Sequence, residues 1–311
     1  MCLYPKLIKN KKYMSNKKNG GVIPAVSDER TLFVPVGCGK CIECLKQKSN
    51  NWKIRLFEEI KYNNDYTFVT LTFSDVSLEY LKSKVKINSD IIDNDIATVG
   101  VRYFFENIRK STKKSLKHWL ITELGQSNTE RVHLHGLIKT TDVDFLRKKW
   151  IWGISHFGSY VNKKTINYIV KYVTKVDTKH KNFVPKIFAS PGLGKGYLEN
   201  YNSLINRFKG ELTNELYINE SGLKISLPIY YRNKIYSEEE RERLWLSKLD
   251  KLERFVCGEK VSIKDNLDEY EKLRDFYRKM NKNLGFGDDS LDWDKKTYKY
   301  RQNWLRYKSM K

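Results

Sequence analysis

Arg131-Val132-His133-Leu134-His135-Gly136-Leu137-Ile138-Lys139 alternates between polar and apolar side chains at most positions. Alternation with period two predicts a β-strand with one face in the core. His133 and His135 then project from the same face, and the apolar residues between them point the other way. Residues 117–124 form a second strand-like run, and the turn-rich residues 125–130 join the two. This pattern predicts an antiparallel hairpin.

Glu123 closes the earlier strand of this hairpin. With a loop centred near residue 128, Glu123 falls opposite His133. Two imidazoles and one carboxylate make a clamp for a divalent cation and leave positions open for water and a substrate oxygen. A histidine pair on a strand surface without any metal is the alternative, and the spacing alone does not separate the two.

The segment after the hairpin predicts a helix that is capped at Thr165 and continues to Lys175. Tyr168 and Tyr172 are four residues apart, which places both phenols on one helical face. Lys171 and Lys175 each follow a tyrosine by three residues, where they can hold a phosphate or favour the phenolate. A metal-polarised phosphate makes attack by a phenol feasible. Half-buried tyrosines that only pack are the alternative.

The chain has 59 Lys and Arg against 37 Asp and Glu, a formal charge of +22 over 311 residues. Such an excess favours a nucleic-acid partner over a small acidic substrate, although solubility is another reason for charge. Candidate phosphate contacts are Lys46, Lys53, Arg55 and Lys195. No apolar run approaches the ~20 residues that cross a bilayer, and the N-terminus lacks a secretory signal, so we expect a soluble intracellular protein without a membrane partner.

Four of the five cysteines lie in the first 44 residues. Cys38, Cys41 and Cys44 have CxxCxxC spacing, and Cys2 can supply the fourth thiolate of a tetrahedral structural Zn²⁺. An iron–sulfur centre needs the same four ligands, and tight packing without metal is the third option. Cys257 is expected to be a packing residue.

Together, these motifs resemble those of HUH endonucleases. The order of features is similar to that of the replication initiators of gokushovirus-like microviruses (Microviridae). Residues 132–137 resemble the metal motif, residues 66–73 the first conserved strand and residues 168–175 the two-tyrosine motif. Stretches typical of that family also occur, namely Cys38 to Cys44, Glu123-Leu124-Gly125 and Pro191-Gly192-Leu193-Gly194. The resemblance covers about residues 30–200.

The resemblance implies an α+β fold, with an antiparallel sheet and helices packed on one face (the HUH endonuclease fold). We expect three segments: a basic, Cys-rich segment at 1–60, the endonuclease core at 61–200 and a mainly helical region at 201–311. In the last segment, a capping box at Ser237–Glu240 predicts a helix that Gly258 ends. Further helices are expected at 267–284 and 292–307.

The resemblance also implies a function. A replication initiator endonuclease of this kind nicks and rejoins single-stranded phage DNA at the origin. One tyrosine forms a 5′-phosphotyrosyl link and frees a 3′-OH that primes rolling-circle replication, and the second tyrosine can later release a closed circle. The family uses Mg²⁺ or Mn²⁺.

The GxxxxGK[ST] pattern of an ATPase is missing from the sequence. We therefore expect a host helicase and polymerase as partners, in the host bacterial cytoplasm. Two alternatives remain open: a non-catalytic DNA- or RNA-binding protein, and a plasmid relaxase or replication protein of the same superfamily.

Overall fold

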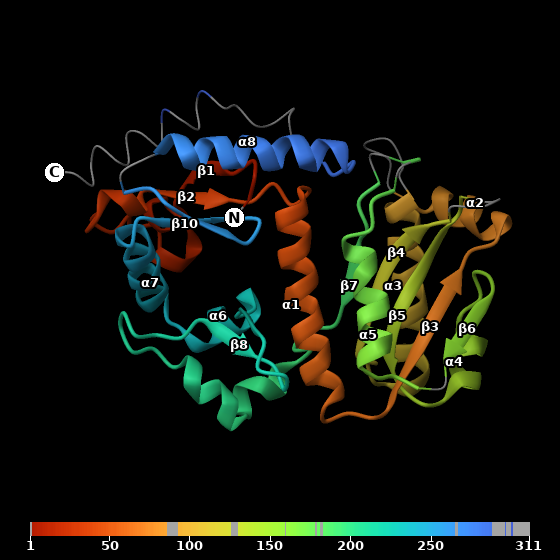
Figure 1. Cartoon of the computed structure of the whole chain (residues 1–311). Coiled ribbons are helices and arrows are strands. Elements are labelled where there is room, and N and C mark those ends of the chain that lie inside the picture. The colour runs from red at the N-terminus through yellow and green to blue at the C-terminus, as the bar shows by residue number, and fades with distance from the viewer. Residues whose placement is uncertain are drawn as a thin grey trace. The chain divides into compact units, whose positions relative to one another are not determined.

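The computed structural model describes residues 2–85, 93–125, 130–158, 160–177, 179–180, 183–264, 267–287, 296 and 300. The chain forms two compact units, one of residues 49–203 and one that combines residues 1–48 with 204–311 (Figure 1). We expected consecutive segments divided near residues 60 and 200. The structure instead groups the cysteine-rich N-terminal segment with the C-terminal region. The helix expected at 292–307 lies outside the described residues, apart from residues 296 and 300.

A five-stranded antiparallel sheet forms the centre of the unit 49–203. Its strand order is β6-β3-β5-β4-β7, so the strand that carries His133 and His135 is central, as predicted. The bounds are β3 Tyr66–Thr72, β4 His118–Leu124, β5 Val132–Lys139, β6 Ser155–Gly158 and β7 Ile187–Ala189.

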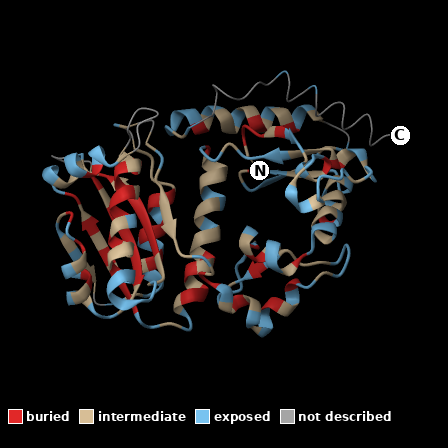
Figure 2. Ribbon diagram, turned by 180° about the vertical axis from the view of Figure 1, so that it is seen from behind, coloured by how far each residue is buried: buried red, intermediate tan, exposed pale blue. Residues whose placement is uncertain are grey.

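Helices pack against both faces of this sheet. They are α1 Ile42–Ile60, α2 Asp75–Ser83, α3 Asp93–Thr112, α4 Val143–Lys149 and α5 Lys163–Val170. On one face, the buried Leu71 and Leu134 join a core with Phe104 of α3. On the other face, Trp119 and Ile121 of β4 pack with residues of α1 and α5. The buried strands and the helices on their two sides are seen in Figures 1 and 2.

The observed α+β class, with its antiparallel sheet, is the class that we expected. Helices cover two faces rather than one because β4 is apolar on both sides: Trp119, Leu120 and Ile121 are all fully buried. A strand with consecutive apolar residues needs a packing partner on each face.

Gly136 allows β5 and β4 to approach closely. A Cβ atom at this position would lie 2.0 Å from the Trp119 carbonyl oxygen and 2.7 Å from Leu120 Cα. Because these are backbone atoms of a central strand, we expect Gly136→Ala to lower the free energy of unfolding by about 3 kcal/mol or more.

Urea unfolding measures this loss, and Gly125→Ala is the matched control. A Cβ at Gly125 would meet its nearest neighbour at an ordinary 3.6 Å. The control should change stability by less than about 1 kcal/mol. Equal stabilities of the two variants would contradict the steric argument.

The other unit contains three small hairpins and three helices among its described residues. The hairpins pair β1 Lys6–Lys9 with β2 Phe33–Val36, β8 Leu216–Ile218 with β9 Lys224–Ser226, and β10 Glu253–Val256 with β11 Glu259–Ser262. The helices are α6 Ile229–Ile235, α7 Glu238–Asp250 and α8 Leu267–Asn283. Along the chain, short 3-10 helices occur at Lys11–Tyr13, Lys17–Asn19, Glu29–Thr31, Lys171–Val173, Lys195–Glu199 and Tyr201–Asn206.

The predicted helix from Ser237 begins at its capping box but ends at Asp250, not at Gly258. Residues 253–262 form a hairpin instead. Its turn places Cys257 at φ +51° and Gly258 at φ +99°, a left-handed pair that suits a tight hairpin turn. Among the described residues, no helix is long and apolar enough to cross a membrane.

Candidate metal and tyrosine site

Glu123, His133 and His135 converge on one face of the sheet. In the register of β4 and β5, Glu123 pairs directly with His133, as the predicted hairpin required. Glu123 Oε2 lies 3.1 Å from Nε2 of His133 and 3.0 Å from Nε2 of His135. The three candidate ligand atoms all lie within 4.8 Å of one another. Because they come from the rigid centre of the sheet, their spacing is held by backbone hydrogen bonds.

The far side of each imidazole ring is also held. Nδ1 of His133 donates to the Arg131 carbonyl oxygen at 3.3 Å, and Nδ1 of His135 lies 3.0 Å from Thr70 Oγ1 on β3. With its Nδ1 proton bound to a carbonyl, a neutral His133 ring turns an unprotonated Nε2 toward Glu123. Such outer contacts orient histidine ligands in metal sites. The donor set of two nitrogens and one carboxylate therefore fits a divalent cation.

The Glu123 carboxylate is ionised in this setting. Burial by itself raises its pKa, but hydrogen bonds with His133, His135 and Lys175 outweigh burial and hold the pKa well below its ordinary value. Lys175 Nζ donates to Glu123 Oε1, the oxygen that does not face the histidines. One carboxylate oxygen thus meets a lysine, and the other faces the two imidazole nitrogens.

The tyrosine segment begins three residues earlier than predicted. Asn162, not Thr165, caps α5, because its side chain accepts from the Thr165 amide while the Thr165 hydroxyl accepts from the Asn162 amide. The helix ends at Val170 and continues as the 3-10 turn Lys171–Val173. Tyr168 therefore lies in α5 and Tyr172 in the turn.

The two phenols share a hydrogen bond beside the histidines. Tyr172 Oη donates to Tyr168 Oη at 2.7 Å. The Tyr172 ring stacks on the His135 ring, with 4.6 Å between centroids and 6° between planes. Tyr172 is 5% exposed, whereas Tyr168 is 42% exposed. The two tyrosines thus differ in access to a large substrate.

The electrostatic settings of the tyrosines differ as well. Burial raises the pKa of the Tyr172 phenol well above its ordinary value, and the hydrogen bond to Tyr168 and the negative charge of Glu123 add to this rise. Lys171 Nζ lies 4.1 Å from the centroid of the Tyr168 ring and 5.3 Å from that of Tyr172. Its positive charge is closer to the exposed phenol.

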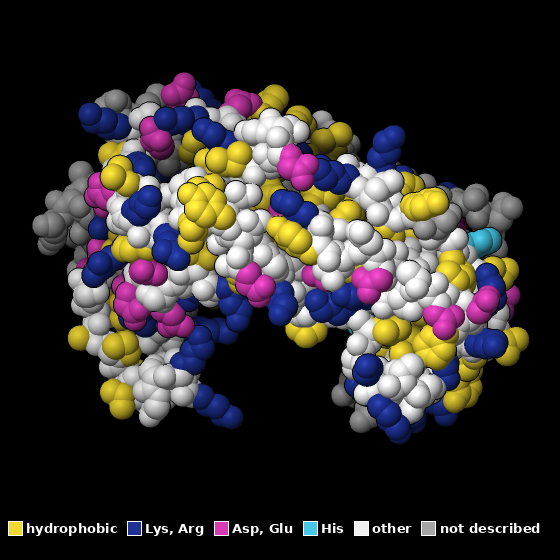
Figure 3. Space-filling view, turned by 90° about the horizontal axis from the view of Figure 1, so that it is seen from below, with side chains coloured by type: hydrophobic (Ala, Val, Ile, Leu, Met, Phe, Trp, Pro, Cys, Tyr) yellow, Lys and Arg dark blue, Asp and Glu magenta, His cyan; other side chains and the backbone are white. Residues whose placement is uncertain are grey.

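The predicted DNA-contacting residues lie elsewhere on their elements. Arg55 stacks on Trp52 and donates from Nε to the Leu193 carbonyl oxygen at 3.1 Å, so it fastens the loop after β7 to α1. Lys53 lies 5.6 Å from the Phe57 ring centroid. Lys46, in the other compact unit, and Lys195 are exposed. Their contacts with DNA remain a prediction. On the face seen in Figure 3, basic side chains are spread widely among acidic and apolar ones.

Thr70 is a residue that the sequence did not assign to the site. The structure shows that its hydroxyl meets His135. The signal was present, because Thr70 and Thr72 share one face of the strand Tyr66–Thr72, and β3 pairs these threonines with His135 and His133. The pairing of the two strands was the missing information.

Known proteins share this part of the chain. Residues 66–177 match the family model of Replication-associated protein ORF2. The chain is similar to phage replication-associated proteins. Replication-associated protein VP4 of Bdellovibrio phage phiMH2K is 23% identical over 258 residues, covering 75% of this chain and 78% of that protein. Replication-associated protein ORF2 of Spiroplasma virus 4 is 25% identical over 293 residues, covering 81% of this chain and 86% of that protein. These matches confirm the expected resemblance to phage replication proteins.

A solved structure was also found. The catalytic domain of the Adeno Associated Virus type 5 Rep protein aligns with 60% of this chain and 98% of that chain, with 15% sequence identity and a TM-score of 0.19. An overlap this low carries no argument about the fold or the chemistry of this chain. The fold described above rests on the strands and helices themselves.

Proposed function

We propose that this protein is a replication initiator that nicks and rejoins single-stranded DNA through a phosphotyrosine intermediate. The observation that carries the proposal is the hydrogen-bonded pair Tyr168 and Tyr172 beside the convergent Glu123, His133 and His135. Nucleic-acid binding alone does not require this arrangement. The similarity to phage replication-associated proteins supports the replication setting.

The three converging side chains would hold Mg²⁺ or Mn²⁺, both of which accept mixed oxygen and nitrogen ligands. When bound there, such a cation neutralises charge on a scissile phosphate. The histidines hold their unprotonated nitrogens toward it, and Thr70 fixes the ring of His135. Lys175 keeps Glu123 in place through the second carboxylate oxygen.

Tyr168 is the better candidate for the first attack. Its phenol is accessible, and its oxygen accepts a hydrogen bond from Tyr172. Both this hydrogen bond and the nearby Lys171 cation favour the negative charge that develops as Tyr168 loses its proton. The Tyr168 oxygen would bond to phosphorus, and the 3′ oxygen of the preceding nucleotide would leave and take up a proton. The products are a 5′-phosphotyrosyl link and a free 3′-OH that can prime synthesis.

Tyr172 then has a distinct task. Once Tyr168 is esterified, Tyr172 is the remaining phenol next to the candidate metal ligands. Its attack on a second phosphodiester would free a 3′-OH, which can attack the Tyr168 ester and close a circle. Host helicase and host polymerase would supply unwinding and synthesis in the bacterial cytoplasm, since the sequence lacks an ATPase motif.

Detection of a covalent adduct tests this proposal. Purified protein is incubated with Mn²⁺ and single-stranded oligonucleotides that tile the replicon encoding the chain, and products are separated on a denaturing gel. We expect an adduct for the native protein and for Tyr160→Phe, a matched variant of a tyrosine that is 83% exposed. The double variant Tyr168→Phe with Tyr172→Phe should bind the same DNA without forming an adduct.

Two outcomes would contradict the assignment. An adduct that survives in the double variant would show that another residue is the nucleophile. Binding by the native protein without an adduct on any origin-containing strand would favour the non-catalytic nucleic-acid-binding function.

A further inference from the structure

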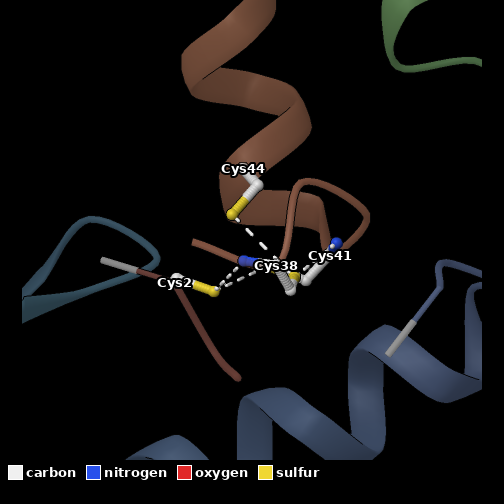
Figure 4. Close-up of side chains that lie close together, drawn as sticks. All are labelled: Cys2, Cys38, Cys41 and Cys44. Atoms are coloured by element: carbon white, nitrogen blue, oxygen red, sulfur yellow. Dashed lines mark hydrogen bonds between the residues drawn. The ribbon is translucent and has the colours of Figure 1, made fainter. Parts of the chain in front are cut away.

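We propose that Cys2, Cys38, Cys41 and Cys44 bind one structural Zn²⁺ ion. Figure 4 shows the four thiol groups pointing toward one another from the N-terminal segment, from the loop before α1 and from the first turns of that helix. All four residues belong to the unit made of residues 1–48 and 204–311. This site is separate from the candidate metal ligands on β4 and β5 and does not depend on the proposed nicking activity.

The sulfur spacing matches a single tetrahedral metal. Cys2 Sγ lies 3.9 Å from Cys41 Sγ, and Cys38 Sγ lies 4.0 Å from Cys44 Sγ. All four sulfur atoms lie within 4.8 Å of one another. A zinc ion with Zn–S bonds of about 2.3 Å places its sulfur ligands about 3.8 Å apart in a tetrahedron. A disulfide needs about 2.05 Å, and all four cysteines are free.

Backbone amide groups also point at the sulfur atoms. The amides of Tyr4 and Cys38 donate to Cys2 Sγ at 3.3 and 3.2 Å, and the amide of Cys41 donates to Cys38 Sγ at 3.3 Å. Donors of this kind orient metal ligands and favour thiolate over thiol.

Glycine is needed beside one of these sulfur atoms. A Cβ at Gly37 would lie only 3.0 Å from Cys44 Sγ. In the same loop, Gly39 adopts φ +77°, which a side chain disfavours. The loop is thus shaped around the sulfur atoms.

The cluster lies where several distant segments meet within this unit. Cys41 is fully buried in a core with Leu3, Val256 of β10 and Tyr270 of α8. Arg278 of α8 donates to the Leu3 carbonyl oxygen at 2.9 Å, next to Cys2 in the chain. Arg274 Nη2 donates to the same oxygen at 3.3 Å, and its residue is 1% exposed.

A zinc ion held by four thiolates carries a net negative charge. The guanidinium groups of Arg274 and Arg278 lie in the surroundings of that charge and would partly offset it. The ion would fasten the N-terminal segment and the start of α1 to each other, at the core that α8 and β10 complete. Four protein ligands leave no position for a substrate, so the site is structural.

A single zinc ion fits better than an iron–sulfur cluster. In such a cluster, several iron and sulfide atoms lie between the cysteine sulfur atoms, which are therefore farther apart than around one ion. The spacing of 3.9 to 4.0 Å observed here matches one ion.

Metal analysis of the purified full-length protein tests the site first. After desalting without chelator, we expect about one zinc per chain by mass spectrometry. The same stoichiometry is expected for the variant with His133→Gln and His135→Gln, because that variant removes only the other candidate site. Less than about half an equivalent of zinc, or iron in its place, would overturn the proposal.

Cobalt substitution identifies the ligands without relying on a variant that folds poorly. Protein loaded with Co²⁺ should show thiolate-to-cobalt charge-transfer absorption and the visible bands of a tetrahedral ion. Absence of the charge-transfer absorption in the native chain would overturn the assignment to cysteine.

A pair of matched variants completes the test. Cys44→Ser should release zinc to a competing chelator at a concentration at least about 100-fold lower than native protein requires. Cys257→Ser should retain native affinity, because Cys257 packs in the same core but is not one of the four converging residues. Equal zinc affinities in the two variants would contradict the four-cysteine assignment.

Discussion

Tyr168→Phe is expected to slow formation of the covalent DNA adduct by at least about 1,000-fold, because removal of a nucleophile eliminates the step that forms the intermediate. Tyr172→Phe is expected to slow the same step by about 10- to 100-fold, since it removes one hydrogen bond to a developing phenolate. The difference follows from the donor direction and from the exposures of 42% and 5%. Single-turnover assays on an origin strand, resolved on denaturing gels, measure both rates.

Two controls make this comparison specific. Tyr160→Phe should leave the rate unchanged, because Tyr160 is an exposed tyrosine that precedes α5. DNA binding by each variant, measured without metal, should remain within about threefold of native, since one phenolic hydroxyl contributes little beside the phosphate contacts. A larger loss in Tyr172→Phe than in Tyr168→Phe would reverse the proposed order of attack.

Glu123→Gln is expected to weaken Mn²⁺ binding by at least about 100-fold and adduct formation by at least about 1,000-fold. The amide keeps the shape of the side chain but loses the negative charge that faces both imidazole nitrogens and Lys175. Isothermal titration with Mn²⁺ reads the metal site directly, apart from catalysis. Chelation of metal from the native protein should also stop adduct formation.

Glu106→Gln is the matched control for this variant. Glu106 lies on α3, forms a surface ion pair with Arg102 at 3.8 Å and faces none of the candidate ligands in the described contacts. It should bind Mn²⁺ and form the adduct as native protein does. Undiminished adduct formation by Glu123→Gln, or in excess chelator, would refute a metal-dependent mechanism.

Local patterns predicted the pairing at the centre of the site. Period two placed His133 and His135 on one face, and the short connection to the preceding strand placed Glu123 opposite His133, as the register shows. The four-residue spacing of Tyr168 and Tyr172 placed their phenols together. These features depend on backbone geometry over a few residues, which the order of residues expresses directly.

Other features depend on contacts between segments far apart in the chain. The hydrogen bond from Thr70 to His135 required the pairing of β3 with β5, and the bond from Lys175 to Glu123 required α5 and its following turn to pack on the sheet. The helix expected to reach Gly258 stopped early because the left-handed turn at Cys257 and Gly258 allows strand pairing. No local period encodes these outcomes.

By itself, the sequence determined which residues could form a metal clamp, a nucleophile pair and a cysteine cluster, because strand and helix periods and chain connectivity are local properties. Only the tertiary structure decided how those residues differ: which phenol is buried, which one accepts the hydrogen bond and what surrounds Cys2. The physical reason is that burial and electrostatic setting arise from packing between distant segments, such as Leu3 against α8 and Tyr172 against His135.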